Sequence, residues 1–277
     1  MRNKLKIFYD VFVVVAICII AAAAWNIYGI LSNYAESNRE YEDIRKHTGE
    51  AMRRDEDVPF DECWGYTPGK PLIVDFEALK EINPDIIGWI YIPGLEISYP
   101  VLKCSSNDQY LHTTYKGTYA YAGSIFIDEL NKPDFYDKHT IIYGHNMNNG
   151  SMFGRLREFV DLADPPFNPY VWIMTEDMNF CYRIFSSHIA EETDDSYLLF
   201  DKDNTDGFSE WEKKIKDWST VDFEDIDFAK SDRVITLSTC HADHVHRRVV
   251  HALMIHSELP PDADSGSTAS IPEMTSD

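Results

Sequence analysis

The sequence predicts a mainly β fold in which eight short strands form a β-barrel or a sandwich. From residue 86 onward, β-branched and aromatic runs alternate with Gly, Pro and Asn, which is typical of strands joined by turns rather than of βαβ units. A hydrophobic content of 44% over 277 residues indicates a globular protein with a sizeable core. The expected strands are residues 88–92, 99–103, 124–128, 140–144, 170–175, 180–190, 233–237 and 249–256.

The N-terminus precedes these strands with an apolar run over residues 11–31. About 20 apolar residues span a bilayer as a helix, so this run is long enough for one crossing. Basic residues occur before the run at Arg2, Lys4 and Lys6, which predicts a cytoplasmic N-terminus. A cleaved signal peptide is the alternative because residues 21–24 are four alanines. The chain stays apolar from Trp25 to Leu31, which favours a retained anchor.

Three further segments outside the strands have their own patterns. Residues 34–54 are polar with no Pro and predict a helix leaving the membrane, and residues 59–71 read as a linker. Residues 75–82 predict a short helix with Asp75 as its N-cap. Between the sixth and seventh strands, residues 208–218 have apolar positions at helical spacing and predict an amphipathic helix lying on the sheet.

These patterns divide the chain into five parts. The last part contains three Pro and no aromatic residue, so we expect a disordered tail. The parts are a cytoplasmic N-terminus (1–6), a transmembrane anchor (7–31), a juxtamembrane helix and linker (32–71), a domain that holds the expected strands (72–257) and the tail (258–277).

The net charge and the cysteine content exclude some classes of partner and of fold. A net charge of −22 argues against nucleic acid as a partner, because phosphates require a basic face. The cysteines show no compact spacing that would indicate a disulfide framework. We expect Cys104 and Cys181 to be packed inside strands, whereas the sequence does not place Cys63.

Cys240 has a context that indicates reactivity. It ends the run Thr236-Leu237-Ser238-Thr239-Cys240, and the next strand follows the pair Arg247-Arg248. A guanidinium facing the thiol across one short turn would favour the thiolate and could hold an oxyanion. Strand alternation gives Arg248 the parity of the more uniformly apolar face, which favours Arg247 as the residue outside the barrel.

Two questions remain open at this level. The acid or base is expected to be His145, at the end of a β-branched run, with His139 as the fallback. The loop of residues 241–246 carries three histidines beside Cys240, and Cys, His and Asp are all zinc ligands. Their spacing within one loop is unusual for structural zinc, so we expect no metal and no cofactor.

Seven short segments occur in one order along residues 72–256. They are residues 83–90, 99–101, Asn107 with Tyr110 and Leu111, 123–128, 142–147, 151–154 and 236–240. Together they resemble a sortase, and more narrowly a class B sortase. The resemblance implies an eight-stranded sortase-type β-barrel with N-terminal helices and a helix inserted between strands 6 and 7. The loop 241–246 is shorter than this resemblance leads us to expect.

The resemblance also implies a function, that of a membrane-anchored cysteine transpeptidase on the surface of a Gram-positive bacterium. Cys240 would attack the Thr carbonyl of a C-terminal sorting motif, His145 would protonate the departing amine, and Arg247, at the family's Arg-x-Val-Val spacing, would steady the oxyanion. Asn107, Tyr143 and Ser238 would line the peptide groove. The partners would be surface proteins that bear the motif, of the Asn-Pro-x-Thr-Asn or x-Pro-x-Thr-Gly kind, and an amine of the lipid-linked peptidoglycan precursor.

Three alternative functions remain compatible with the same residues. A pilin-polymerising sortase would use a pilin lysine as the acceptor. A cysteine hydrolase would use water. A non-catalytic, membrane-tethered domain would bind the peptide without cleaving it.

Overall fold

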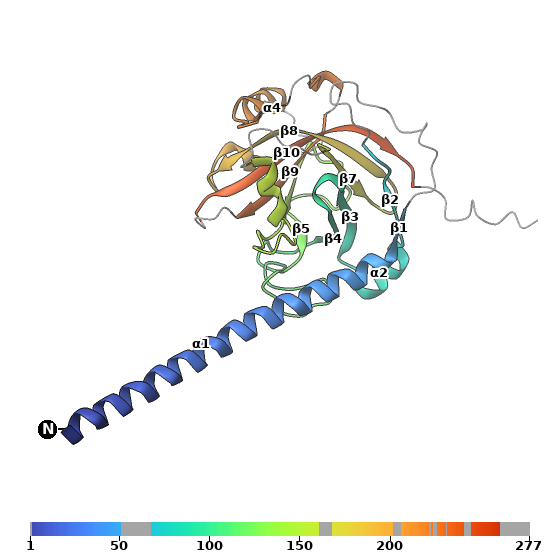
Figure 1. Ribbon diagram of the computed structural model, residues 1–277. Coiled ribbons are helices and arrows are strands. Elements are labelled where there is room, and N and C mark those ends of the chain that lie inside the picture. Colours follow the sequence, from blue (N-terminus) through green and yellow to red (C-terminus); the bar gives the residue numbers. More distant parts are fainter. Residues whose placement is uncertain are drawn as a thin grey trace, which may run out of the picture.

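Eight strands close into a barrel in the computed structural model, which describes residues 2–50, 68–160, 168–201, 206–221, 223, 226–230, 232–240 and 245–260. In barrel order the strands run β10-β8-β7-β3-β4-β5-β6-β9 (Figure 1). Their bounds are β3 (Ile86–Ile92), β4 (Ile97–Lys103), β5 (Ile125–Ile127), β6 (His139–Tyr143), β7 (Tyr170–Met174), β8 (Asn179–Ala190), β9 (Val234–Cys240) and β10 (Arg247–Glu258). The expected eight-stranded barrel is confirmed.

Two of the eight strand pairs are parallel, namely β4 with β5 and β6 with β9, and the other pairs are antiparallel. Parallel neighbours end at the same edge of a sheet, so each pair needs a long crossover connection. The β4–β5 connection covers residues 104–124 and leads from the end of β4 back to the opposite end of the pair, where β5 begins.

The interior of the barrel holds the main hydrophobic core. Alternate residues of each strand point inward, and on β9 and β10 these include Ile235, Leu237, Val250 and Ala252. The opposite parity packs outside the barrel, where Val234 and Leu253 join a second apolar cluster beneath helix α4.

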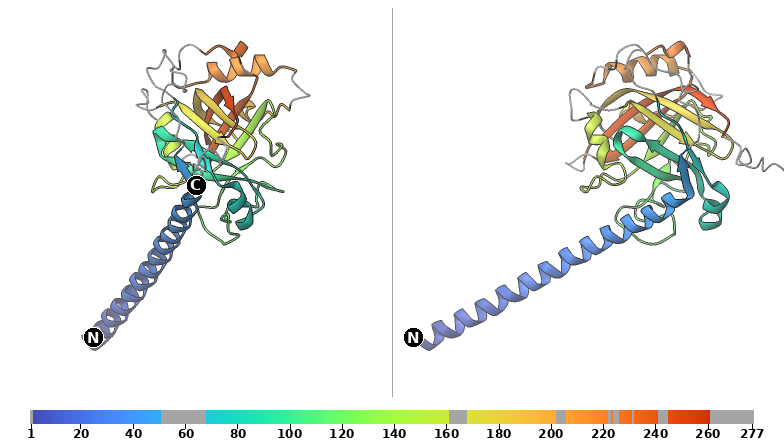
Figure 2. Two further views of the ribbon diagram at one scale, coloured as in Figure 1. Left: turned by 90° about the vertical axis from the view of Figure 1, so that its right-hand side faces the viewer. Right: turned by 45° about the vertical axis from the view of Figure 1, so that its right-hand side comes forward.

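Helix α4 (Phe208–Asp217) lies between β8 and β9 in the chain and covers the outer face formed by β8, β9 and β10 (Figures 1 and 2). It buries Phe208, Trp211 and Ile215, the apolar stripe that the sequence predicted. The inserted helix between barrel strands 6 and 7 is therefore confirmed. Trp218, the last predicted position of the stripe, is instead the C-cap residue and is 36% exposed.

Helix α1 (Arg2–Ile44) is continuous and projects from the barrel as a straight rod (Figure 2). Its C-terminal part packs on the domain, because Tyr41 and Ile44 belong to the main core. Among the described residues, this is the one helix long and apolar enough to cross a membrane.

The structure corrects the expected helix over residues 34–54. The helix ends at Ile44, one 3-10 turn follows as η1 (Arg45–His47), and β1 (Thr48–Glu50) then pairs antiparallel with β2 (Leu72–Val74). A polar run without Pro is compatible with a helix, but pairing with a distant strand overrides this local preference. Residues 51–54 and most of the expected linker lie outside the described residues.

The remaining helices are short. Helix α2 (Phe76–Ile82) begins where predicted, and the Asp75 carboxylate accepts a hydrogen bond from the Ala78 amide at 3.0 Å. Helix α3 (Arg157–Val160) follows a 3-10 turn. The 3-10 helices of the barrel are η3 (Pro93–Leu95), η4 (Gly154–Leu156), η5 (Asp195–Tyr197) and η6 (Phe228–Lys230).

The last two strands are longer than expected. Strand β9 continues through Cys240 instead of ending at 237, and β10 begins at Arg247 rather than at 249. The two strands pair through polar residues up to Cys240 and Arg247, because the backbone ladder continues where the apolar pattern stops.

Candidate active site

Three neighbouring strands bring the predicted catalytic residues to one edge of the barrel. In the parallel pair β6–β9, Tyr143 lies opposite Ser238, and the Gly144 amide extends the ladder by donating to the Ser238 carbonyl at 3.2 Å. His145 and Cys240 follow at this same edge. Because β10 is antiparallel to β9, its first residue, Arg247, is the register partner of Cys240.

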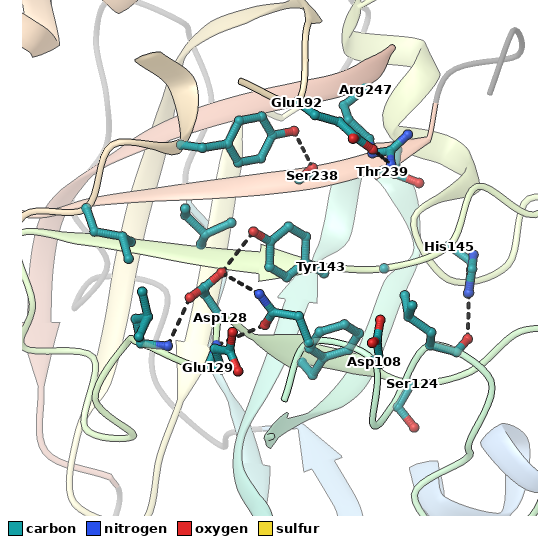
Figure 3. Close-up of a pocket in the computed structure, with 18 residues that line it drawn as sticks. Asp108, Ser124, Asp128, Glu129, Tyr143, His145, Glu192, Ser238, Thr239 and Arg247 are labelled. Carbon is teal, nitrogen blue, oxygen red and sulfur yellow. Dashed lines mark hydrogen bonds and ion pairs between the residues drawn. The ribbon is translucent and has the colours of Figure 1, made fainter. Parts of the chain in front are cut away.

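This edge opens into a pocket of about 540 Å³. Five of the six predicted site residues line it, and Figure 3 labels Tyr143, His145, Ser238 and Arg247 around the cavity. The five are Asn107, Tyr143, His145, Ser238 and Arg247. The side chain of the sixth, Cys240, lies outside what the structure describes, so its position is given by the strand register alone.

Arg247 and Arg248 separate as strand alternation predicts. Arg247 lines the pocket, where its Nη2 donates to Oε1 of Glu192. Arg248 has the parity of Val250 and Ala252 in the barrel core and is 5% exposed. The Glu192 side chain is 61% exposed, so its ion pair with Arg247 is weak enough for a ligand to replace it.

The His145 imidazole is oriented by a backbone carbonyl. Its Nε2 lies 2.6 Å from the Leu111 oxygen, and since a carbonyl only accepts, Nε2 carries the proton. In the neutral ring Nδ1 is therefore the basic atom. Burial lowers the pKa of His145, the Leu111 carbonyl partly opposes this, and the nearby His112 and Arg247 lower it further. The neutral form of His145 is thus favoured near pH 7.

Two rings from the β4–β5 connection stack with His145. His112 is nearly parallel to it at 5.3 Å between centroids and 12° between planes, and Tyr121 lies at 5.8 Å and 21°. His112 and Tyr121 also stack with each other at 5.7 Å. Sequence reasoning missed both residues, because no periodic pattern marks residues 104–124.

A buried carboxylate holds two of the predicted groove residues. Oδ2 of Asp128 accepts from Nδ2 of Asn107 at 2.9 Å and from the Tyr143 hydroxyl at 3.0 Å, as Figure 3 shows for Tyr143. Its Oδ1 accepts from the Leu130 amide at 2.9 Å. Burial, followed by the Asp128 charge, raises the pKa of Tyr143, so its hydroxyl stays protonated and donates. Asp128 ended a predicted strand as an acid after three apolar residues, a signal that could have identified it.

The Ser238 hydroxyl forms a hydrogen bond with a tyrosine that also lines the pocket. Its Oγ lies 2.8 Å from the hydroxyl of Tyr197, which belongs to η5 and also lines the pocket. Burial raises the pKa of Tyr197 to about 12. Tyr197 lies in an acidic connection without an apolar pattern, so sequence reasoning missed it.

Gly144, which precedes the imidazole, has no room for a side chain. A Cβ there would collide with the Ile125 and Phe153 side chains. Gly123, with φ of 55°, would likewise press a Cβ against the carbonyl oxygens of Tyr110 and Leu111. Gly144 therefore lets the end of β6 pack closely against Ile125 of β5 and Phe153, and Gly123 lets residue 123 lie close to the Tyr110 and Leu111 carbonyls.

The other chemistry-bearing residues lie elsewhere or remain untested. Cys104 and Cys181 are buried and free; Cys181 lies in β8 as predicted, whereas Cys104 follows the last residue of β4. His139 is fully buried and bonds Leu198 and Thr236. The described residues contain no cluster of three or more metal ligands, but Cys63 and four residues of the His-rich loop, 241–244, are outside them, so the zinc alternative stays open.

Comparison with known proteins identifies the class to which this barrel and its edge belong. The sortase domain family matches residues 90–255, which is more than half of the chain. The chain therefore belongs to the sortase family of cysteine transpeptidases.

The relatives narrow this to class B. The chain is 41% identical over 173 residues to Sortase B of Listeria monocytogenes, covering 61% of this chain and 68% of the relative. It is 30% identical to Sortase B of Staphylococcus aureus, covering 65% and 74%. The crystal structure of sortase B from B. anthracis superposes with a TM-score of 0.63 at 28% identity, covering 81% of this chain and 99% of the other.

Family membership implies protein substrates that carry a sorting motif and an amine acceptor. The apolar helix α1 is consistent with a membrane-associated surface enzyme.

Proposed function

We propose that the chain anchors surface proteins to the cell wall, with Cys240 as nucleophile, His145 as general acid and base, and Arg247 as the oxyanion ligand. The observation that carries this proposal is the strand register. It brings Cys240 opposite Arg247 and ends the neighbouring β6 one residue before Gly144-His145.

The chemistry follows from these neighbours in two steps. The Cys240 thiolate adds to the carbonyl carbon of the motif Thr, and the Arg247 guanidinium stabilises the oxygen that becomes negative. As the thiolate forms, Nδ1 of His145 takes the proton of the Cys240 thiol. The C–N bond then breaks, this proton passes from Nδ1 to the leaving amine, and a thioester remains on Cys240. In the second step an incoming amine attacks the thioester, gives a proton to His145 and releases the thiolate.

The pocket supports an extended peptide as the substrate. Asp128 holds both Asn107 and Tyr143 by hydrogen bonds. Ser238 lies on the side of Tyr143 toward Arg247 and away from Asp128 (Figure 3). We assign Asn107, Tyr143 and Ser238 to binding of the residues that precede the scissile bond.

We further propose that the acceptor is an amine of the lipid-linked peptidoglycan precursor. The helix α1 would span the membrane with its N-terminus in the cytoplasm and the barrel outside. Both substrates would then share one membrane with the enzyme, which raises their effective concentration. A pilin lysine is the alternative acceptor.

Mass spectrometry with sorting-motif peptides tests this proposal. We expect the wild-type chain to form a thioester adduct on Cys240, Cys240→Ala to form none, and the matched control Cys104→Ala to react like the wild type. Absence of adduct and cleavage in the wild type, across a panel of motif pentapeptides, would favour a binding domain.

Adding amines distinguishes the transferase from a hydrolase. We expect a peptidoglycan-like amine to convert the product from the free acid to the amide. A product that stays a free acid at every concentration of every amine would contradict transpeptidation.

A further inference from the structure

Helix α1 contacts the connection of residues 104–124 along its last three turns, at several points. The Tyr41 hydroxyl donates to the Gly123 carbonyl at 2.5 Å, and the Tyr115 hydroxyl donates to the Glu40 carbonyl at 2.8 Å. The Asn33 side chain accepts from the Tyr121 amide at 3.1 Å.

Aromatic packing reinforces these hydrogen bonds. Tyr41 packs against Tyr99 and Tyr115 at 5.3 and 5.4 Å between ring centroids, and Tyr34 lies 6.3 Å from Tyr121. Tyr41 is 3% exposed. This end of α1 is therefore part of the domain and not a free tether.

The same connection holds His145. Leu111 supplies the carbonyl that accepts from Nε2, and Tyr121 and His112 supply the stacked rings. The residues that contact α1 and those that contact His145 are joined within this connection, because its first and second halves pair with each other. The Ser124 amide donates to the Tyr110 carbonyl at 3.0 Å, and the Ala120 amide donates to the His112 carbonyl at 3.0 Å. A shift of residues 120–124 would thus move Leu111 as well.

We propose that residues 33–41 of α1 are a brace for the acid–base histidine, acting through Tyr121 and the Leu111 carbonyl. This inference rests on the proposed role of His145 and deepens it. Tyr121 is a positioning residue, because it touches the imidazole and not the reacting carbonyl. The helix that anchors the enzyme also completes the orientation of its active site.

The environment of His145 makes the effect of the brace measurable. The groups that face the ring are His112 and Tyr121 from the connection and Arg247 from β10, while the carboxylates of Asp108 and Glu192 line the same pocket. Burial is the main reason why the pKa of His145 is low. Removing a ring that covers the imidazole admits water and raises the pKa toward its ordinary value of about 6.5.

The test uses the full chain in detergent micelles with a cleavable motif peptide. We expect Tyr121→Ala to lower kcat by roughly 10- to 100-fold with little change in KM, because a misplaced general acid slows the chemical step rather than binding. The limb of the kcat/KM profile that reports His145 should move to higher pH. Tyr121→Phe keeps the ring and should restore both values.

Tyr136 offers a matched control. It is 38% exposed against 48% for Tyr121, and it packs on Phe180 and beneath Arg233. We expect Tyr136→Ala to leave kcat and the pH profile unchanged. An unchanged profile in Tyr121→Ala, or an equal loss of kcat in Tyr136→Ala, overturns the positioning role.

Tyr41→Phe tests the contribution of the helix itself. This variant keeps the packing and removes the hydrogen bond to Gly123, so we expect a shift of the pH limb in the same direction as in Tyr121→Ala, but smaller. If Tyr121→Ala changes the profile and Tyr41→Phe does not, the loop positions His145 without the helix, and the brace is refuted.

His145→Ala separates this inference from the proposed function. An active His145→Ala enzyme would contradict the acid–base role itself. An inactive one, with wild-type behaviour in Tyr121→Ala, would contradict only the brace.

Discussion

Arg247 and Arg248 are adjacent in the sequence and lie on opposite faces of β10. Arg247 reaches the pocket, whereas Arg248 is 5% exposed and has the parity of core residues Val250 and Ala252. The register gives Arg247, and not Arg248, Cys240 as its direct neighbour on β9. One residue of difference therefore separates a candidate catalytic role from a structural one.

Lysine substitutions should separate the two arginines. We expect Arg247→Lys to lower kcat by roughly 10²-fold, because a point charge on a flexible stem replaces a fork that can donate two hydrogen bonds to one oxyanion. Arg248→Lys should lower the melting temperature and largely keep kcat in the folded enzyme. Steady-state kinetics and thermal unfolding of both variants check this, and a catalytic loss confined to Arg248→Lys would reverse the assignment.

At the scale of elements, α4 covers a chain of three buried histidines on the outer face of β6, β8, β9 and β10. Nε2 of His139 lies 2.6 Å from Oγ1 of Thr236, which lies 2.7 Å from Nδ1 of His251. His251 stacks with His188 at 5.3 Å, and Nε2 of His188 lies 3.0 Å from Oγ of Ser196 in η5. The chain thus joins the sheet to the 3-10 turn that carries Tyr197.

Burial lowers the pKa of all three histidines. That of His139 falls to about 4, and the pKa values of His188 and His251 are also lowered, the latter further by its two histidine neighbours. In the unfolded chain these histidines bind protons near pH 6.5, whereas in the folded chain they stay neutral at that pH. The free energy of unfolding therefore keeps the full contribution of these neutral histidines above about pH 6.5 and decreases as the pH falls toward 4.

Urea unfolding between pH 7 and pH 5 tests this cluster. Each histidine should contribute a slope of up to about 1.4 kcal/mol per pH unit to the free energy of unfolding. His251→Asn should be less stable at pH 7 and show a shallower slope. Val234→Ala, in the apolar cluster beneath α4, serves as the control, because it removes no titratable group and should keep the wild-type slope. A free energy of unfolding that is flat over this range would contradict the prediction.

At the scale of the whole molecule, one helix carries both the apolar segment and a part of the barrel core. The apolar side chains of its N-terminal half are exposed, and Tyr41 and Ile44 are buried in the domain. Exposed apolar surface of this extent is unfavourable in water and is stable in a bilayer.

Membrane fractionation tests the anchor. We expect the full chain to remain in the membrane pellet after carbonate extraction and residues 33–277, which keep the domain contacts of α1, to stay in the supernatant. Protease added to intact cells should digest the barrel and spare a tag at the N-terminus. Release of the full chain by carbonate would contradict a spanning anchor, and digestion of the tag would contradict the orientation.

Local sequence patterns predicted much of the fold because local physics determines those parts. The eight barrel strands, the Asp75 cap and the apolar stripe of α4 depend on residues close in the chain. Pairing of β1 with β2 was not predictable in this way, since its register joins Thr48 to Val74 across a polar segment.

The residues of the candidate site also fall into those that the sequence identified and those that it did not. Cys240, His145 and Arg247 were identified because each ends or begins a recognisable strand, and motif order gave Asn107, Tyr143 and Ser238. Asp128, Tyr197 and Tyr121 were missed, because their importance lies in the partners they meet and not in their own neighbourhoods.

The sequence by itself determined a class B sortase barrel, its helix over β8, β9 and β10, and the residue types available for thiol chemistry. Only the tertiary structure decided which atom of His145 carries the proton, that Asp128 serves two groove residues, and that α1 holds the connection around the imidazole. Tyr41 and Gly123 are 82 positions apart, and their contact exists only once the barrel has closed. The periodicity of a segment reflects its own preference for helix or strand, whereas such contacts depend on how all the other segments fold and pack.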